Sequence, residues 1–478
     1  MSPPTAELAG LSISSKKTGP GGKPLVNAAV VGEWHDAKAA YTGPKLSRRT
    51  WENEHFAGSE GLDFVFRITY DDEANPSGMI NLGMAENTML TKDYLEYYAK
   101  VFSKALRPND FTYGTQASAS KRFHTAVADM WNENFTPLTP VQPDDIATAP
   151  GATGALDQLF SVLGDAGDAV LIAAPHYNGF DANMVVRSGA RIVHVYGPEP
   201  DIAFTTPGAE IAAFEKAMED CKAKGINVRA VLLCSPQNPW GRTYSKEVLL
   251  DYALFAEKHD IHLISDEIYA LSVWDNPKIP NSPPFISMLS LDVEKETGKR
   301  FDKSRLHIVY SFSKDFGCNG FRLGVIISQH NPLVIRGLLH ISFVAKLGSI
   351  GDALISHLIN DKPTFKELVA KNVDALRDSS EKMAAFCEKQ GWKPVPVNSG
   401  HFMMVDASNL GFKTMEEEKD FGRHCIEFGV GVGLGQSYHA RTPGWLRLTH
   451  TYAPDRLDLA LERLGKAVEA WRSRGLRE

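Results

Sequence analysis

Short apolar runs alternate with helix-like segments between about residues 115 and 330. The clearest of these runs read AVLIAAP, RAVLLCS, HLIS, LHIVYSFS and LGVIIS, and several are apolar throughout instead of alternating with polar residues. Uninterrupted apolar strands are typical of a parallel sheet that is covered on both faces. Strands of this kind that alternate with helices predict an α/β fold with a mostly parallel central sheet.

The pattern changes on either side of this region. Residues 1–60 are rich in Gly, Pro, Ser, Lys and Ala and show little apolar periodicity, so we expect a partly ordered N-terminal arm that could wrap a partner subunit. After about residue 345 helical periodicity dominates, and HFMMVD and WLRLTH follow as later strands. The sequence therefore predicts a large domain over residues 111–340 and a smaller α+β domain built from residues 61–110 and 341–478.

Composition narrows the class of partner. The chain of 478 residues is 43% hydrophobic and 23% charged, and its net charge of -7 offers no basic surface for nucleic acid or an anionic membrane. The five cysteines are far apart and form no CxxC pair, so the sequence suggests neither a disulfide framework nor a metal site. No apolar run approaches the roughly 18 residues of a membrane span, and no secretory signal is recognisable, so we expect a cytoplasmic protein that acts on small polar molecules.

Polar side chains follow three of the predicted strands. RAVLLCS leads into PQNPWG, which contains Asn238; HLIS leads into DEIY, which contains Asp266 and Tyr269; LHIVYSFS leads into Lys314. The carboxyl ends of parallel strands meet at one edge of the sheet, where ligands of such folds bind. We therefore expect these side chains to form one site.

A fourth segment is suited to an anion. DIATAPGATGALDQLF reads as a short strand, a glycine turn and a helix start, which leaves backbone N–H groups near Ala152 and Thr153 free to hold a phosphate. Arg322 follows Lys314 by eight residues and carries a planar fork suited to bidentate phosphate contacts. Two hydroxyl groups precede the lysine, those of Ser311 and Ser313.

A buried lysine, a carboxylate, a phosphate seat and a tyrosine together describe what pyridoxal 5'-phosphate requires. Burial disfavours the ammonium form of Lys314 and makes its amine available for a Schiff base. Asp266 would keep the pyridine nitrogen protonated, and Tyr269 and Asn238 would bond the phenolate oxygen of the ring. Tyr177, in APHYNGFD, offers a flat side chain that can stack on the ring.

The motifs also resemble a known family. NPSGMINLGMAEN, PGATGALDQL, APHYNGFD, SPQNPWG, LISDEIYA, YSFSKDFGCNGFRLG and SYHARTPGWLRL stand in the order and spacing of fold-type I pyridoxal phosphate enzymes of aminotransferase class I/II. Within that family the chain is most similar to 1-aminocyclopropane-1-carboxylate (ACC) synthases and their fungal ACC-synthase-like relatives. The resemblance implies a large domain with a mostly parallel sheet, a smaller α+β domain, and a homodimer with active sites shared between subunits.

The resemblance carries site residues as well. It repeats the roles given above to the lysine, the carboxylate, the two phenolate partners and the stacking tyrosine. It adds a tyrosine that reaches the phosphate of the neighbouring subunit, Tyr113, an arginine that grips the substrate α-carboxylate, Arg447, and a glutamate beside the substrate pocket, Glu86. It also implies a substrate contact for Asn238, and it matches the phosphate site at Ala152, Thr153, Ser311 and Arg322.

The chain departs from the synthases close to the cofactor. They typically read YHGLP, YYPGFD and FPGFRVG, where this chain reads YGTQASAS, HYNGFD and CNGFRLG. Four residues replace larger aromatic, proline or aliphatic groups: His176, Asn178, Cys318 and Asn319. We expect cofactor binding to survive these changes and substrate choice to differ.

The reaction type stays open among three alternatives. In both catalytic alternatives the amine of Lys314 is placed to remove the α-proton of the substrate. Loss of a sulfur group from the γ- or β-carbon then gives lyase chemistry, with S-adenosylmethionine as a candidate substrate, and this is the predicted function. Return of the proton to the cofactor gives an aminotransferase that exchanges its amino group with a 2-oxo acid. A ligand-sensing domain without activity is the third alternative, and the complete catalytic set argues against it.

Overall fold

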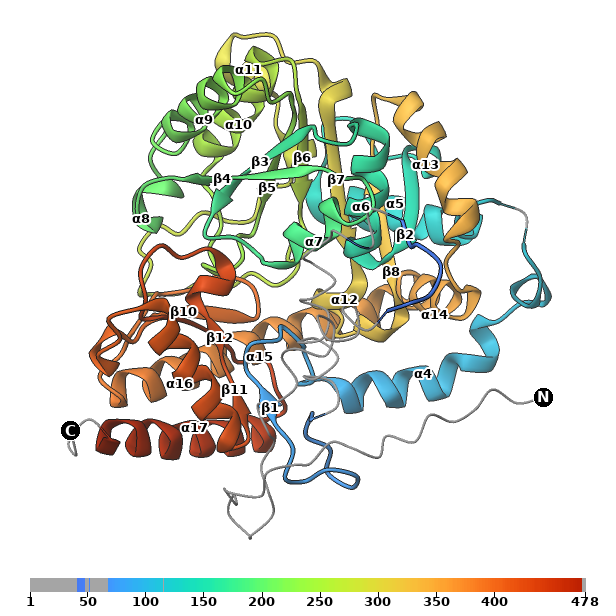
Figure 1. Ribbon diagram of the computed structural model, residues 1–478. Coiled ribbons are helices and arrows are strands. Elements are labelled where there is room, and N and C mark those ends of the chain that lie inside the picture. The colour runs from blue at the N-terminus through green and yellow to red at the C-terminus, as the bar shows by residue number, and fades with distance from the viewer. Residues whose placement is uncertain (1–40, 48–50, 52–67, 115, 475–478) are drawn as a thin grey trace. The chain divides into compact units, whose positions relative to one another are not determined.

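The computed structural model describes residues 41–47, 51, 68–114 and 116–474 (Figure 1). Most of the expected N-terminal arm, residues 1–60, lies outside this description. The chain divides into two compact units. One comprises the described parts of Met1–Leu82, Glu416–Val432 and Asp458–Glu478, and the other comprises Gly83–Met415 and Gly433–Leu457. The boundaries expected at residues 61–110, 111–340 and 341–478 stay a prediction.

The larger unit contains a seven-stranded sheet in the order β2-β8-β7-β6-β5-β3-β4. Neighbours from β7 through β4 pair in parallel, and β8 alone runs antiparallel to the strands beside it. The predicted α/β fold with a mostly parallel sheet is therefore confirmed. The strands are β2 Ile146–Pro150, β3 Ala169–Ala174, β4 Arg191–Tyr196, β5 Val228–Cys234, β6 His262–Asp266, β7 Leu306–Ser311 and β8 Leu323–Ile327.

Successive residues of the central strands enter opposite halves of the core. Ile308 packs with the helices of one face, whereas the next residue, Val309, packs with those of the other. Strands β7 and β8 are buried at every position because both faces are covered, which explains their uninterrupted apolar sequence. One face is covered by α5 Lys121–Phe135, α10 Lys246–Lys258 and α14 Ser349–Asn360, and the other by α6 Gly151–Leu163, α7 Gly179–Val185 and α13 Pro332–Val344.

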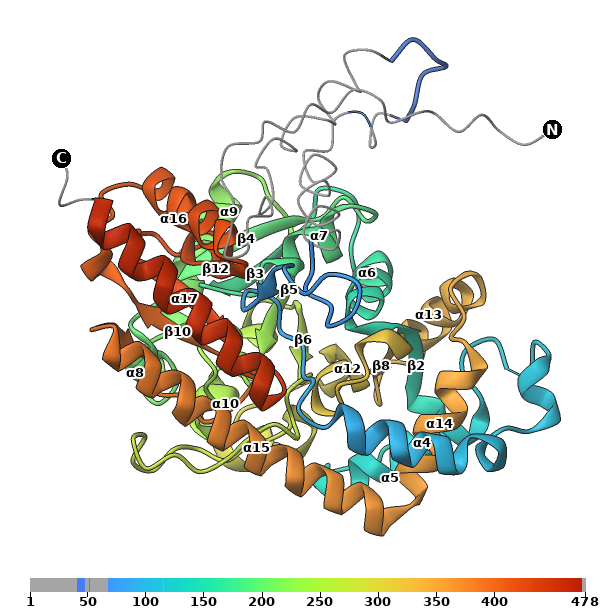
Figure 2. The ribbon, with the colours of Figure 1, turned by 90° about the horizontal axis from the view of Figure 1, so that it is seen from below.

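A second sheet in the larger unit has the order β12-β13-β10-β9 and is antiparallel where its strands pair. The predicted later strands HFMMVD and WLRLTH are confirmed as β10 and β13. Helix α15 packs against this sheet, and α4 lies beside α14 in both views (Figures 1 and 2). The bounds are β9 Lys393–Pro394, β10 Phe402–Asp406, β12 Gly433–Leu434, β13 Trp445–Thr449, α4 Thr91–Ala105 and α15 Lys362–Lys389.

The smaller unit is held by backbone pairing and one arginine. Strand β1 (Ile80–Asn81) pairs in parallel with β11 (Val430–Gly431). The guanidinium of Arg463 donates to the carbonyl oxygens of Gly78 at 2.7 Å and Gly429 at 2.9 Å. The other α-helices that the structure describes are α8 Pro200–Ala203, α9 Ile211–Ala223, α11 Val293–Thr297, α12 Phe312–Asp315, α16 Met415–Glu427 and α17 Pro454–Arg474. Among the described residues no helix has the length and apolar character that crossing a membrane requires.

Two glycines let the turn between β2 and α6 lie against β8. A Cβ on Gly324 would lie 2.4 Å from the carbonyl carbon of Gly151. Gly151 itself has a φ of +75°, and a Cβ there would lie 2.4 Å from Nη2 of Arg322. Because backbone atoms cannot move aside as a flexible side chain can, only glycine at residue 324 permits this contact.

We predict that Gly324→Ala lowers the free energy of unfolding by about 1 to 3 kcal/mol, the usual cost of forcing extra volume into a packed site. Urea denaturation of the purified protein measures this. Gly320→Ala is the matched control, since a Cβ on Gly320 meets nothing within 4 Å and no positive φ is involved. Equal denaturation midpoints for the two variants would contradict the steric argument.

Candidate active site

The carboxyl edge of the large sheet brings the predicted polar residues together. Asp266 is the last residue of β6, and Lys314 lies in α12, the short helix that follows β7. Lys314 lies close enough to four other predicted residues for their charges to shift its pKa: Arg447, Glu86, Arg322 and Asp266. The convergence expected from the strand order is therefore what the structure has.

The amine of Lys314 is part-buried among groups of both signs. Burial, followed by the positive charges of Arg447 and Arg322, lowers its pKa to about 8, while Glu86 and Asp266 oppose the shift. Its Nζ donates to the backbone carbonyl of Ala85 at 2.5 Å. An ordinary lysine titrates near 10.4, so the neutral amine is far more abundant here at physiological pH.

Asp266 is a buried carboxylate with few partners. It is 4% exposed, and its one hydrogen bond in the described structure comes from the backbone N–H of Ile268, at 3.3 Å. Burial raises its pKa to about 7, against the smaller effects of that hydrogen bond and of Lys314. No cationic side chain among the described residues forms an ion pair with it. A ligand that carries a protonated ring nitrogen would supply the missing donor.

Arg447 is held between two aromatic rings. Its guanidinium carbon lies 4.5 Å from the ring centroid of Phe402 and 4.4 Å from that of Tyr438. It donates to Oδ1 of Asn238 at 3.0 Å and to the carbonyl oxygen of Gly83 at 2.6 Å. Its Nε is buried without a partner. Donors therefore remain for a carboxylate in an otherwise desolvated position.

The segment predicted to hold the phosphate lies where β2 meets α6. Gly151 donates its backbone N–H to the carbonyl of Arg322 at 3.1 Å, and Nη2 of Arg322 donates to the carbonyl of Pro150 at 2.9 Å. No side chain caps the N-terminus of α6, where Ala152 and Thr153 lie. An uncapped helix N-terminus beside an arginine attracts an anion.

The two serines of SFSK lie together at the end of β7. The hydroxyl of Ser311 accepts from the backbone N–H of Ser313 at 3.2 Å, and the two hydroxyl oxygens are 2.8 Å apart. Both residues are buried, and their hydroxyls share a single strand end with Lys314. The two serines thus add hydrogen-bonding hydroxyl groups to the same edge of the sheet.

Two predicted tyrosines lie among these groups. Burial raises the pKa of Tyr177, and the charges of Arg447, Asp266 and Arg322 act on it in that order, so its ring lies close to them. Tyr269 is 2% exposed and meets the ring of Phe402 edge-on at 5.5 Å. Burial raises its pKa well above the usual value, and its hydroxyl has no hydrogen bond within the described part of the chain.

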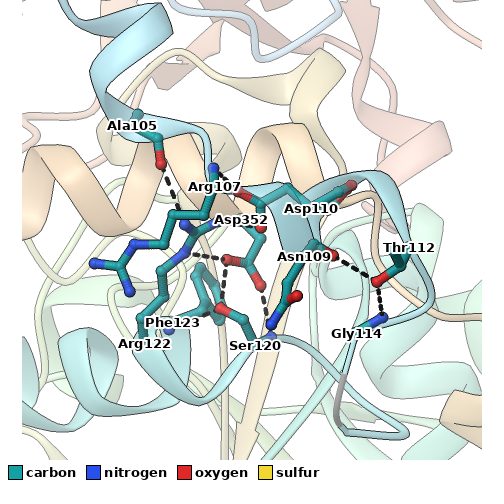
Figure 3. A network of polar contacts seen from close by, with 11 residues as sticks. Ala105, Arg107, Asn109, Asp110, Thr112, Gly114, Ser120, Arg122, Phe123 and Asp352 are labelled. Carbon is teal, nitrogen blue, oxygen red and sulfur yellow. Dashed lines mark hydrogen bonds and ion pairs between the residues drawn. The ribbon is translucent and has the colours of Figure 1, made fainter.

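Tyr113 lies apart from this cluster. Its side chain is 93% exposed, so within one chain it contacts none of the groups above. Hydrogen bonds nevertheless fix residues on both sides of it: Asp110 accepts from Nη2 of Arg122 at 2.7 Å, and the hydroxyl of Ser120 donates to Asp352 at 2.7 Å (Figure 3). The role predicted for Tyr113 needs a neighbouring subunit and stays a prediction.

Some contacts in the site were not assigned from the sequence. Phe402 and Tyr438 enclose Arg447, and the carbonyl of Ala85 receives Lys314. Ala85 and Tyr438 lie inside the family motifs and Phe402 lies in the predicted strand HFMMVD, yet no spacing rule distinguishes an aromatic that stacks on an arginine from one that fills a core. Cys318 is buried, accepts or donates weakly at 3.9 Å to Tyr98, and donates to the carbonyl of Phe316 at 3.2 Å, which is a packing role.

A desolvated lysine, an unpaired buried carboxylate and an anion seat between two strands fit pyridoxal 5'-phosphate, and they define a class of enzyme that binds it on an α/β fold. The chain belongs to the aminotransferase class I and II family, whose model matches residues 77–464. The predicted family, cofactor and enzymatic nature are thereby confirmed.

Relatives of two kinds share much of the sequence. The probable aminotransferase aclI of Aspergillus oryzae is 35% identical over 80% of this chain and 90% of its own length. 1-Aminocyclopropane-1-carboxylate synthase 3 of Oryza sativa subsp. japonica is 32% identical over 88% of this chain and 93% of its own. Both the aminotransferase and the ACC synthase resemblance are therefore real.

Solved structures share the fold. A double mutant of Thermus thermophilus aspartate aminotransferase superposes with a TM-score of 0.69 at 19% identity, covering 89% of this chain and all of that one. The aromatic aminotransferase of Pyrococcus horikoshii gives a TM-score of 0.68 at 21% identity. At such identities the likeness concerns architecture alone.

The pKa of Asp266 leads to a prediction about stability. A free aspartate titrates near 4, whereas burial raises the pKa of Asp266 to about 7. The folded cofactor-free chain therefore binds more protons than the unfolded chain between about pH 4 and 7, and this carboxyl destabilises the fold increasingly as pH rises through that window. At pH 8 and without cofactor, the free energy of unfolding of Asp266→Asn should therefore exceed that of wild type by a few kcal/mol, because each pKa unit corresponds to about 1.4 kcal/mol.

With cofactor bound the order should reverse, because an amide cannot balance a protonated ring nitrogen. Urea denaturation of both forms at pH 5 and pH 8 tests this. Asp315→Asn is the control, since burial raises the pKa of Asp315 to about 7 as well, yet its oxygens accept from Leu271, Ser272 and Tyr310. That variant should lose stability in both forms. An Asp266→Asn protein that is less stable than wild type without cofactor would refute the argument.

Proposed function

We propose that this enzyme is a pyridoxal phosphate-dependent lyase that removes the α-proton of an amino acid and expels a sulfur leaving group from its γ- or β-carbon, with S-adenosylmethionine as a candidate substrate. The observation that carries the proposal is the arrangement of Arg447 and Glu86 around Lys314. One charge suits the α-carboxylate of the substrate, and the other suits a cationic side chain.

Arg447 binds the carboxylate. Its guanidinium is fixed in a plane by the two aromatic rings and by Asn238, so a bidentate contact fixes the α-carbon in turn. Because Nε lacks a partner in the described structure, this binding satisfies a donor that is otherwise buried at a cost.

The bound cofactor withdraws electrons from the α-carbon, which acidifies its proton. Asp266 keeps the ring nitrogen protonated, Tyr269 and Asn238 hydrogen-bond the ring oxygen, and Tyr177 stacks on the ring face. The phosphate is held at the start of α6 by Ala152 and Thr153, and by Ser311, Ser313 and Arg322.

Lys314 moves the proton. Its amine, with a pKa of about 8, is neutral in an appreciable fraction of molecules near pH 7, and a base tuned in this way commonly contributes 10²- to 10⁴-fold to the rate. The carbonyl of Ala85 lies within hydrogen-bond reach of the same nitrogen and orients it. Proton removal from the α-carbon is common to the lyase and the aminotransferase reactions.

Glu86 favours the lyase over the aminotransferase. Its carboxylate acts on the charge of Lys314, and we propose that it faces the substrate side chain, where it would attract a sulfonium such as that of S-adenosylmethionine. It repels the distal carboxylate of a dicarboxylic 2-oxo acid. The cations whose charges reach Lys314 are Arg447 and Arg322, and both already have an anion to bind.

Aminotransfer remains the second candidate, because relatives named probable aminotransferases share 35% and 31% of their aligned residues with this chain.

We propose in addition a homodimer in which Tyr113 reaches the neighbouring site, and a cytoplasmic location.

Product analysis separates the two reactions. The enzyme is incubated with S-adenosylmethionine, and separately with an amino acid plus 2-oxoglutarate. We expect release of methylthioadenosine in the first case and little exchange of amino groups in the second. Lys314→Ala should lose both the absorbance of the lysine-bound cofactor and the product. Rapid conversion to the pyridoxamine form with keto-acid formation, and no methylthioadenosine, would contradict the lyase proposal in favour of aminotransfer.

Substitutions of Arg447 and of Glu86 should have different effects on the kinetic constants. Arg447→Leu should raise KM for every α-amino acid by roughly 30-fold or more, because loss of one partner of a buried charge pair costs at least about 2 kcal/mol. Arg447→Lys keeps the charge but not the planar fork, so its KM should lie between those of wild type and Arg447→Leu. Glu86→Gln should lower kcat/KM for S-adenosylmethionine more than for an uncharged amino acid. Equal effects of Glu86→Gln on both substrates would show that it does not meet the side chain.

A further inference from the structure

Four side chains outside the cofactor site converge between β3, β4 and the segment after β12. They are three histidines and one aspartate: His176, His194, His439 and Asp181. One potential ligand atom from each lies within 4.8 Å of the corresponding atoms of the others. The ring centroids of His194 and His439 are 4.0 Å apart, and those of His176 and His439 are 4.5 Å apart. All four belong to the larger unit.

Hydrogen bonds already orient the first histidine. Nδ1 of His176 lies 2.9 Å from the carbonyl oxygen of Tyr177. A carbonyl can only accept, so Nδ1 carries the hydrogen and Nε2 of the neutral ring presents a lone pair. That Nε2 faces Nδ1 of His194 at 2.9 Å. A histidine whose far nitrogen donates to a backbone carbonyl has the geometry commonly found in metal ligands.

The other pair is equally close. Nε2 of His439 lies 2.7 Å from Oδ2 of Asp181, although the two residues are 258 positions apart in the chain. Three imidazole nitrogens and one carboxylate oxygen form a donor set suited to zinc and similar divalent ions. In a tetrahedral zinc site, bonds of about 2.0 to 2.1 Å place neighbouring ligand atoms roughly 3.3 Å apart. The two contacts of 2.7 and 2.9 Å and the upper limit of 4.8 Å bracket that value.

We propose that His176, His194, His439 and Asp181 form a binding site for a divalent transition-metal ion of the zinc class. The ion would occupy a closed four-ligand site, which is the structural rather than the hydrolytic arrangement. The cysteine pattern gave no sign of it, because its ligands come from separate segments and none of them is a cysteine.

An ion at this site would join the segment that carries Tyr177 to two others. The backbone N–H of His176 donates to the carbonyl of Tyr438 at 3.1 Å. Two residues beyond His194 and His439, the guanidinium of Arg441 lies 3.7 Å from the ring centroid of Tyr196, so the same two segments meet twice. A cavity of about 280 Å³, lined in part by His439, Tyr196 and Arg441, lies beside the site.

The test uses the full-length enzyme with its pyridoxal phosphate in place, freed of metal by a chelator. Titration with zinc chloride in a calorimeter should show one ion per chain, and zinc should raise the thermal midpoint. Magnesium, which prefers oxygen ligands in octahedral geometry, should do neither. His194→Gln and Asp181→Asn should each weaken zinc binding at least about tenfold, and the double variant should lose the thermal shift.

His259→Gln is the matched control. Nε2 of His259 lies 3.0 Å from the carboxylate of Glu215, so this substitution removes a histidine–carboxylate pair elsewhere on the chain. Zinc binding should be unchanged in this variant. Cobalt(II) bound to the wild type gives a second readout that needs no variant, since a tetrahedral site gives intense visible bands and an octahedral one does not. The proposal is overturned if zinc does not bind saturably, if binding survives in His194→Gln and Asp181→Asn, or if cobalt shows an octahedral spectrum.

Discussion

The ammonium group of Lys314 loses most of its hydration where β7 ends and α12 begins, and this loss lowers its pKa to about 8. Two arginines add to the shift, and two carboxylates oppose it. Much of the surrounding structure sustains that balance. The apolar strands keep water out, the glycine contact between residues 151 and 324 brings Arg322 close, and the second sheet supplies Arg447. A site with either arginine missing would hold a more ordinary, protonated lysine.

The same burial is costly at Asp266. A carboxylate with one backbone donor and no ion pair among the described residues is unfavourable in a folded chain, and its raised pKa expresses that cost. Asp315, four residues beyond the end of β7, is as deeply buried but accepts hydrogen bonds from three donors. One carboxylate is thus satisfied by the protein itself, whereas the other awaits a ligand, and this difference separates a structural group from one suited to a cofactor.

The fold and the centre of the site could be predicted because they depend on local pattern and on one topological rule. Uninterrupted apolar strands indicated a parallel sheet, and the convergence of their carboxyl ends brought Asp266 and Lys314 together without further information. The aromatic pair around Arg447 could not be found in this way, since Phe402 reaches it through the register of β10 against β13 and Tyr438 through the turn before β13. Nor could the histidine cluster, whose members are joined only by tertiary contacts between distant segments.

The departures from the ACC synthase motifs differ in their consequences. Cys318 replaces a larger residue but only fills space beside Tyr98, so it changes the packing there and not the charge. His176 does more, because its ring binds both the carbonyl of Tyr177 and the ring of His194. A substitution that gains a partner in β4 fixes the backbone beside Tyr177, the residue proposed to stack on the cofactor ring. We therefore expect substrate preference in this chain to depend on the backbone of residues 176 and 177 as well as on the motif residues near the cofactor.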